Sequence, residues 1–313
     1  MLNKLFLIIT CLIFSINCSN ISKNESTKGY FSDYFVFISS DEGDPLIIPV
    51  DINWHQDKPK SISAEFKAWY GTNKPWPIIY DIKKRQLEEK FPVDWTNVKP
   101  INKIQWSSNG ETIEIDFSNI GKVKLFIKKP DISSTIQNKP DDNIIITSTA
   151  VKTKIETANG LRHGWLIHEN VRKLSETIKN DSSPSAFSRF HWIPLVYKDN
   201  LYLFIKDGKG KQNAIHWYQF MDIVKFKQTN EFNFTETSLN HDLNSKRNDV
   251  PTSWKIDIPL WKLTLTLNSN DGHTGYGSIN KKGEKALYRQ ALMTGKTNGN
   301  FSVHGMLELI LSD

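Results

Sequence analysis

Cysteine is nearly absent from this chain of 313 residues, and both cysteines, Cys11 and Cys18, lie near the N-terminus. The remaining sequence therefore has no pair of thiols that could form a disulfide. An exported protein of this size without disulfides has to rely on its hydrophobic core for stability. We expect a folded body that buries a large apolar core.

Apolar runs long enough to cross a membrane are also missing. The run at residues 5–16 follows the single basic residue Lys4, and a membrane-spanning helix needs about 20 apolar residues. A charged start followed by a short apolar stretch is typical of a secretory signal. We predict that residues 1–17 are a signal peptide that is removed on export.

Cys18 stands directly after this stretch and resembles the acylated cysteine of bacterial lipoproteins. The usual leucine three residues earlier is replaced by Ser15, so ordinary cleavage beside Ser15 and Asn17 is the alternative. We expect lipidated Cys18 to begin a flexible tether over residues 18–30, because this stretch is polar. Two or three acyl chains anchor a protein stably, which predicts a location in the cell envelope, at the periplasmic face or the outer membrane.

Several motifs of catalysis and cofactor binding are absent from the sequence. It has no glycine-rich phosphate loop, no Gly-x-Ser-x-Gly turn and no cysteine nucleophile in the body. His163 with His168, or His191 with His216, lack the spacing and companion ligands of a metal site. We predict no metal and no other cofactor.

Charge is not concentrated on any part of the chain. The formal net charge is +6, and lysines and arginines are scattered among acidic residues, with brief clusters at residues 83–85 and 281–282. A protein that binds nucleic acid gathers its basic residues on one face or stripe. We therefore predict no nucleic-acid partner.

Aromatic residues are plentiful, with 10 Trp, 9 Tyr and 17 Phe, and they favour strands and apolar cavities. Apolar and polar residues alternate in short segments, which indicates half-buried antiparallel strands. The clearest segments are residues 62–68, 113–116, 123–127 and 261–267, and the clearest turns are residues 198–200, 207–210 and 298–300. Residues 201–205 are predicted as one arm of a hairpin.

Helical patterns are few and short. Residues 170–179 and 82–90 are the two candidates, and residues 180–185 are polar enough to separate two domains. Many short strands at spacings of about ten residues are typical of barrels and sandwiches. The pattern predicts an all-β protein with few short helices.

Three stretches resemble the hydroxyneurosporene synthase (carotenoid 1,2-hydratase) and AttH-like family. Residues 160–169 are similar to the glycine-rich approach to a Trp-x-Asp-His-Glu segment. Residues 190–208 are similar to the strands and turns that open the second barrel of that family. Residues 254–309 contain segments similar to its closing strands. The resemblance implies two tandem lipocalin-like antiparallel β-barrels, which we expect over residues 31–180 and 185–313.

The chain departs from the family pattern at acidic positions. Ile167 stands in place of the Asp, Asn170 in place of the Trp after the Glu, and Tyr288 where relatives often have Glu. Hydration of an alkene starts with proton transfer to carbon, which needs an acid with a raised pKa. Ile167 cannot supply a proton, so the resemblance leaves Glu169 or His168 as the candidate catalytic residue.

Neighbouring residues of a strand point to opposite faces, so we expect only one of His168 and Glu169 to face a barrel interior. The alternative is that both bind loop backbone at the junction of the barrels. Candidate ligand-binding residues are aromatic side chains of the resembling stretches: Trp165, Trp192, Tyr202, Trp217 and Tyr288.

Three functions follow from this reading. The first is a lipoprotein that binds an extended hydrophobic molecule, such as a terpenoid or an acyl lipid. The second is a hydratase, cyclase or isomerase that acts on a similar molecule. The third is an envelope scaffold that binds partners through an exposed apolar patch. The sequence leaves the ligand, the choice of membrane and the oligomeric state open.

Overall fold

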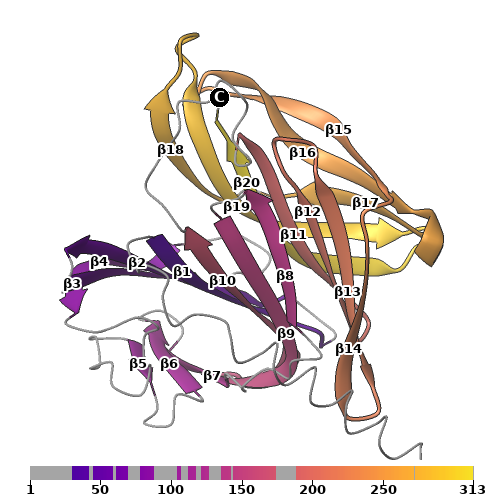
Figure 1. Cartoon of the computed structure of the whole chain (residues 1–313). Coiled ribbons are helices and arrows are strands. Elements are labelled where there is room, and N and C mark those ends of the chain that lie inside the picture. The colour runs from indigo at the N-terminus through magenta and orange to yellow at the C-terminus, as the bar shows by residue number, and fades with distance from the viewer. Residues whose placement is uncertain are drawn as a thin grey trace, which may run out of the picture.

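The structure is a computed structural model, and most of its described residues lie in strands (Figure 1). It describes residues 30–41, 45–58, 61–69, 78–87, 104–106, 112–117, 121–126, 135–141, 144–173, 188–270 and 272–312. The predicted signal peptide and nearly all of the predicted tether, with Cys18, lie outside these residues. None of the described helices has the length and apolar character needed to cross a membrane.

The first ten strands form one antiparallel sheet in the order β4-β3-β2-β1-β10-β9-β7-β6-β5, and β8 pairs with β9 beside this path. Their bounds are β1 Tyr30–Ser39, β2 Ile47–Lys58, β3 Ser61–Trp69, β4 Ile78–Leu87, β5 Ile104–Trp106, β6 Thr112–Phe117, β7 Gly121–Phe126, β8 Thr135–Asp141, β9 Ile144–Thr157 and β10 Gly160–Lys173.

The last ten strands form a second antiparallel sheet in the order β14-β13-β12-β11-β20-β19-β17-β16-β15, and β18 pairs with β19 beside this path. Their bounds, with the short 3-10 turn η3, are β11 Arg189–Tyr197, β12 Asn200–Lys206, β13 Gln212–Phe220, β14 Ile223–Thr229, β15 Asn233–Asp242, β16 Arg247–Ile258, η3 Pro259–Trp261, β17 Leu263–Ser269, β18 His273–Ile279, β19 Lys285–Thr297 and β20 Ser302–Leu311.

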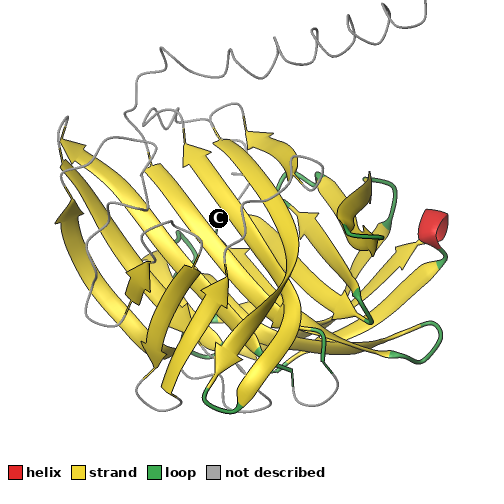
Figure 2. Ribbon diagram, turned by 90° about the horizontal axis from the view of Figure 1, so that it is seen from below, coloured by secondary structure: helices red, strands yellow, loops and turns green. Residues whose placement is uncertain are grey.

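The two sheets follow the same plan. In each, the first strand pairs with the last (β1 with β10, β11 with β20), so the chain returns to where the sheet began. Each sheet twists strongly into a half-barrel, as Figures 1 and 2 show. The predicted all-β fold is confirmed: two antiparallel sheets in tandem, each strongly curled.

Alternation along the strands explains the burial of the second sheet. Leu263, Leu265 and Leu267 of β17 are buried, while Thr264 and Thr266 between them are more exposed. Trp261, which the alternation placed in the same strand, belongs instead to η3, where Pro259 begins a short turn. The period-two prediction therefore identified the buried face and missed the start of the strand.

The two predicted helices are strands wherever the structure describes them. Residues 170–173 extend β10 and pair with both β1 and β9. Residues 82–87 belong to β4 and pair with β3. In both cases ladder hydrogen bonds to neighbouring strands outweigh a weak helical pattern, because helix propensity is easily overridden by tertiary contacts.

Two apolar clusters pack against the second sheet. The first lies on the concave face, where β11 and β12 meet β15, β16 and β17 across the curl. The second lies between the sheets and joins side chains of both. We call this second cluster the inter-sheet core; its members are Tyr34, Val36, Ile38, Ile47, Ala150, Trp165, Ile167, Phe190, Trp192, Val196, Leu201, Leu203, Ile215, Trp217, Leu292 and Met306.

Candidate functional site

Glu169 of β10 is a buried carboxylic acid at the inter-sheet core, with 6% of its surface exposed. Its Oε1 accepts a hydrogen bond of 2.7 Å from Ser148 Oγ of β9. The same oxygen accepts a hydrogen bond of 2.7 Å from Trp192 Nε1, which belongs to β11 of the other sheet. A single carboxyl oxygen thus links the two sheets.

The protonation of Glu169 differs from that of a surface glutamate. Burial raises its pKa above the ordinary value of 4.5, and the hydrogen bonds from Ser148 and Trp192 oppose this rise without cancelling it. The group therefore keeps its proton to a higher pH than an exposed glutamate. Such a group is suited to act as a general acid.

His168 lies on the opposite face of β10 from Glu169. Its ring stacks on Phe35 of β1, with ring centroids 4.3 Å apart and an interplanar angle of 10°. Phe35 is the register partner of His168 across the ladder. The two predicted catalytic residues therefore serve different faces of the sheet, and Glu169 is the one that reaches the inter-sheet core.

Further polar groups lie near Glu169 at the same interface. Tyr34 is the register partner of Glu169, and its ring lies 5.4 Å from that of Trp192. Gln290 of β19 donates a hydrogen bond of 2.8 Å to the Tyr34 hydroxyl. Among the described residues, Trp165 Nε1 and Gln290 Oε1 are buried without a hydrogen-bond partner. The interface therefore offers one free donor and one free acceptor inside an apolar surround.

The structure brings three of the five predicted ligand residues together. Trp165, Trp192 and Trp217 are almost fully buried in the inter-sheet core. Tyr202 lies on the concave face of the second sheet and stacks on His216 at 4.3 Å. Tyr288 of β19 is half-buried and is a member of neither cluster.

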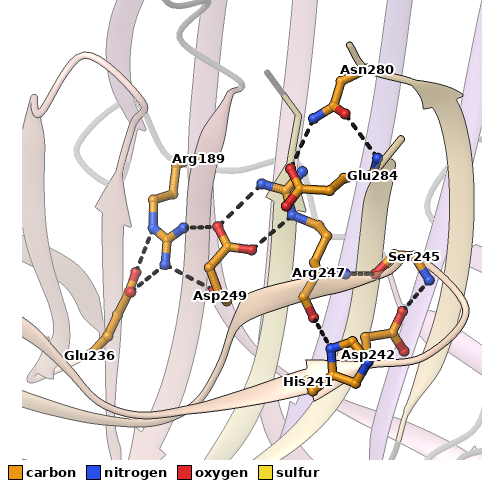
Figure 3. Close-up of polar contacts among 9 residues, drawn as sticks. All are labelled: Arg189, Glu236, His241, Asp242, Ser245, Arg247, Asp249, Asn280 and Glu284. Carbon is orange, nitrogen blue, oxygen red and sulfur yellow. Dashed lines mark hydrogen bonds and ion pairs between the residues drawn. The ribbon is translucent and has the colours of Figure 1, made fainter. Parts of the chain in front are cut away.

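A second polar group of residues joins strands of the second sheet (Figure 3). Arg189 Nε donates to Glu236 Oε1 at 3.0 Å, and Arg189 Nη1 donates to Asp249 Oδ2 at 2.9 Å. Arg247 Nε donates to the other oxygen of Asp249 at 2.9 Å. His191 Nε2 lies 3.1 Å from Glu236 Oε1. These five residues connect β11, β15 and β16.

Burial and neighbouring charges shift the pKa values of Glu236 and His191. Burial by itself would raise the pKa of Glu236, but hydrogen bonds from His191 and Arg189 lower it to about 2. Burial lowers the pKa of His191, and the nearby cations Arg189 and Lys206 act in the same direction. Arg189 pairs with one carboxylate of β15 and one of β16, and these charge-assisted hydrogen bonds hold β11 to both strands.

Sequence reasoning missed Ser148, Tyr34 and Gln290, because each comes from a strand far from Glu169 in the chain. It also missed Glu236, because the pattern of residues in β15 does not set this glutamate apart from its neighbours. No local motif distinguishes these residues from other strand residues. Among the described residues, no group of three or more His, Cys, Asp or Glu side chains is arranged to hold a metal ion.

Neither a family model nor a curated protein matches the sequence. Among solved structures, a protein of Nitrosomonas europaea provisionally named AttH shares 10% identity at a TM-score of 0.46, covering 90% of this chain and 92% of its own. Kievitone hydratase from Nectria haematococca shares 10% identity at 0.49, covering 93% and 91%. CghA with Sch210972 shares 12% identity at 0.49, covering 91% and 89%. At such low identity the likeness concerns the fold alone.

Proposed function

We propose that this protein binds an extended apolar small molecule, of the terpenoid or acyl-lipid class, against its inter-sheet core beside Glu169. The observation that carries the proposal is the buried carboxylic acid of Glu169, set among aromatic side chains of both sheets. Ligand sites are mostly apolar, with a few placed polar groups that orient the ligand. The inter-sheet core has this composition.

The free polar atoms of the core define what the ligand would carry. Trp165 Nε1 can donate a hydrogen bond and Gln290 Oε1 can accept one, and no described residue uses either atom. A buried polar atom without a partner costs free energy of about 1–3 kcal/mol. A hydroxyl group on an otherwise apolar molecule can pair with either atom, because it donates and accepts.

Native mass spectrometry of the protein purified from a lipid-containing host tests this binding. We expect an added mass and, after delipidation, uptake of a hydrophobic fluorescent probe that carries a hydroxyl group. Trp165→Phe, which removes the free donor but keeps an aromatic ring, is expected to lower probe affinity about tenfold, the value of one hydrogen bond. Trp254→Phe is the matched control, since its Nε1 is also buried without a partner but lies on the concave face. A clean unliganded mass with no probe uptake would overturn the proposal.

A second candidate function is favoured by the raised pKa of Glu169. The protonated carboxyl would transfer its proton to an alkene carbon, and the electron pair of the double bond would form the new C–H bond. The faces of Trp192 and Tyr34 would stabilise the resulting tertiary cation. Water would then add to the cation and return a proton to the Glu169 carboxylate, so that the net reaction is hydration.

Incubation with a terpenoid alkene in heavy water tests this chemistry. We expect deuterium at the protonated carbon of the product, and loss of the incorporation in Glu169→Gln. His168→Gln is the control, because His168 faces away from Glu169 and should leave incorporation unchanged. Equal deuterium incorporation in wild-type protein and Glu169→Gln would exclude Glu169 as the acid.

We propose further that the protein is held at the cell envelope through acylated Cys18. The support is the sequence: a short apolar run ends at this cysteine, and a polar stretch follows it. Labelled fatty acid supplied to producing cells should enter the wild-type protein and Cys11→Ser, but not Cys18→Ser. Labelling that persists in Cys18→Ser would contradict this anchor.

A further inference from the structure

Four connections of the second sheet lie at one end of the half-barrel. Neighbouring strands are antiparallel, so the turns β11–β12, β13–β14, β16–β17 and β19–β20 all fall at the same end. Contacts join three of these turns: the rings of Tyr197 and Phe301 lie 5.8 Å apart, and Asn298 N donates to Thr264 O at 2.8 Å. We call this end the rim; Figure 2 shows η3, which belongs to it, in red.

The rim exposes large apolar side chains. The β13–β14 hairpin turns within two residues, with Met221 at a φ of 56° and Phe220 opposite Ile223. The exposed fractions are 52% for Phe220, 79% for Met221, 49% for Ile223, 71% for Leu260 and 50% for Phe301.

Lysines stand over the aromatic rings of the rim. Lys225 Nζ lies 4.7 Å from the centroid of Phe220, and Lys198 Nζ lies 4.6 Å from that of Phe301. Lys227 Nζ lies 5.0 Å from that of Trp261. These side chains carry apolar stems beside the rings and a charge at the end, which is the geometry of residues at a membrane surface.

Acidic residues of the rim do not cancel this charge. Asp199 is held by Lys152 at 3.0 Å, which leaves Asp222 at the tip. The opposite end of the sheet also exposes Leu243 and Ile279. There, however, the Asp242 carboxylate stands beside Leu243 and accepts a hydrogen bond from Ser245 N.

We propose that the rim binds the surface of an anionic lipid membrane, with Phe220, Met221 and Ile223 entering the headgroup region. Exposed apolar patches bordered by charge mark interaction sites. Lysines around such a patch select a negatively charged lipid surface. This contact is separate from Cys18 and from the inter-sheet core, so it depends on neither proposal above.

Site-directed fluorescence on the full chain tests the rim. Cys11→Ser and Cys18→Ser remove the native thiols, and Met221→Cys receives an environment-sensitive label. With phosphatidylglycerol vesicles we expect a blue shift of this label, and little change with phosphatidylcholine vesicles. Leu243→Cys, labelled in the same way at the opposite end, is the matched control and should not shift.

Charge reversal separates the lysines from the apolar tip. Lys198→Glu combined with Lys225→Glu should raise the lipid concentration for half-maximal shift about tenfold or more, because each basic residue adds to the attraction. Both side chains are at the surface, so circular dichroism should remain unchanged. The proposal is overturned if the label at residue 221 does not shift on anionic vesicles, or if it shifts equally on neutral vesicles. An equal shift of the label at residue 243 would also overturn it.

Discussion

Two buried or half-buried glutamates of this protein have opposite acid strengths. Glu169 accepts hydrogen bonds from a hydroxyl and an indole, which are neutral, so burial dominates and raises its pKa. Glu236 faces the Arg189 guanidinium and His191, which lower its pKa to about 2. The charge of the hydrogen-bond donors therefore decides which carboxyl keeps its proton to a higher pH than an exposed glutamate.

Glu169→Gln is expected to change how stability depends on pH. Because the pKa of Glu169 is raised by folding, its contribution to stability is complete below its unfolded value of about 4.5 and is lost as pH rises through the folded value. Glutamine does not titrate and can still accept both hydrogen bonds. Relative to wild type, the variant should gain free energy of unfolding as pH rises from 4 to 8, as urea titrations would measure.

Glu156→Gln is the control for this experiment, because Glu156 of β9 is exposed. Its difference from wild type should stay nearly constant over the same pH range. A difference for Glu169→Gln that is equally flat would mean that burial does not perturb this carboxyl.

Glu236→Gln is expected to show the reverse dependence. A carboxyl with a lowered pKa stabilises the fold above its unfolded value of 4.5, and this contribution is lost as pH falls toward 2. At pH 7 the variant should be less stable by about 2 kcal/mol, typical of a hydrogen bond to a charged group. The deficit should shrink on acidification, and the exposed Glu231→Gln should show neither effect.

At the scale of elements, strands β11 and β20 approach very closely at Gly305. A Cβ atom at this position would lie 1.9 Å from Pro194 O and 2.8 Å from Leu195 Cα. Only glycine permits this approach, which lets β20, the last strand of the sheet, lie close against β11, the first strand. Pro194 belongs to β11, where it removes a backbone donor.

Gly305→Ala should therefore destabilise the protein by about 3 kcal/mol, the upper part of the range for overpacking. Gly275→Ala of β18 is the matched control, because its Cβ would meet no atom closer than 4.0 Å. Thermal unfolding of both variants would measure the difference. Equal stability of the two variants would show that the strands can move apart at no cost.

At the scale of the whole molecule, the inter-sheet core ties the two halves of the chain together. Trp217 of β13 is fully buried there, next to side chains from both sheets. A core shared in this way makes each sheet depend on the other for burial of its outer face. We therefore expect the described sheets to unfold in one cooperative transition.

Trp217→Ala should lower the free energy of unfolding by about 4 kcal/mol, the cost of removing a buried aromatic side chain. Trp261→Ala, at the half-buried rim position, should cost much less. Circular dichroism and tryptophan fluorescence in urea would measure both variants. Two separate transitions in wild-type protein would contradict the shared core.

Much of the fold could be predicted from local pattern alone. The leucines of β17 alternate, and the turns at residues 198–200 and 298–300 join strands as expected. Period-two alternation shows which residues share a face of a strand. It does not show which face meets another sheet, so Trp192 could not be assigned to the inter-sheet core from its parity.

Local patterns in the sequence indicate the all-β class and the residues that share a face of each strand, because these depend on contacts within a few residues. The family resemblance left Glu169 and His168 as alternative candidates for the acid. The folded structure is needed to show that Glu169 meets Trp192, which lies 23 residues away across two sheets. It also decided that His168 faces elsewhere and that Arg189, Glu236 and Asp249 form one group. Such contacts join distant strands, and their partners are set by how the sheets curl and pack rather than by any local pattern.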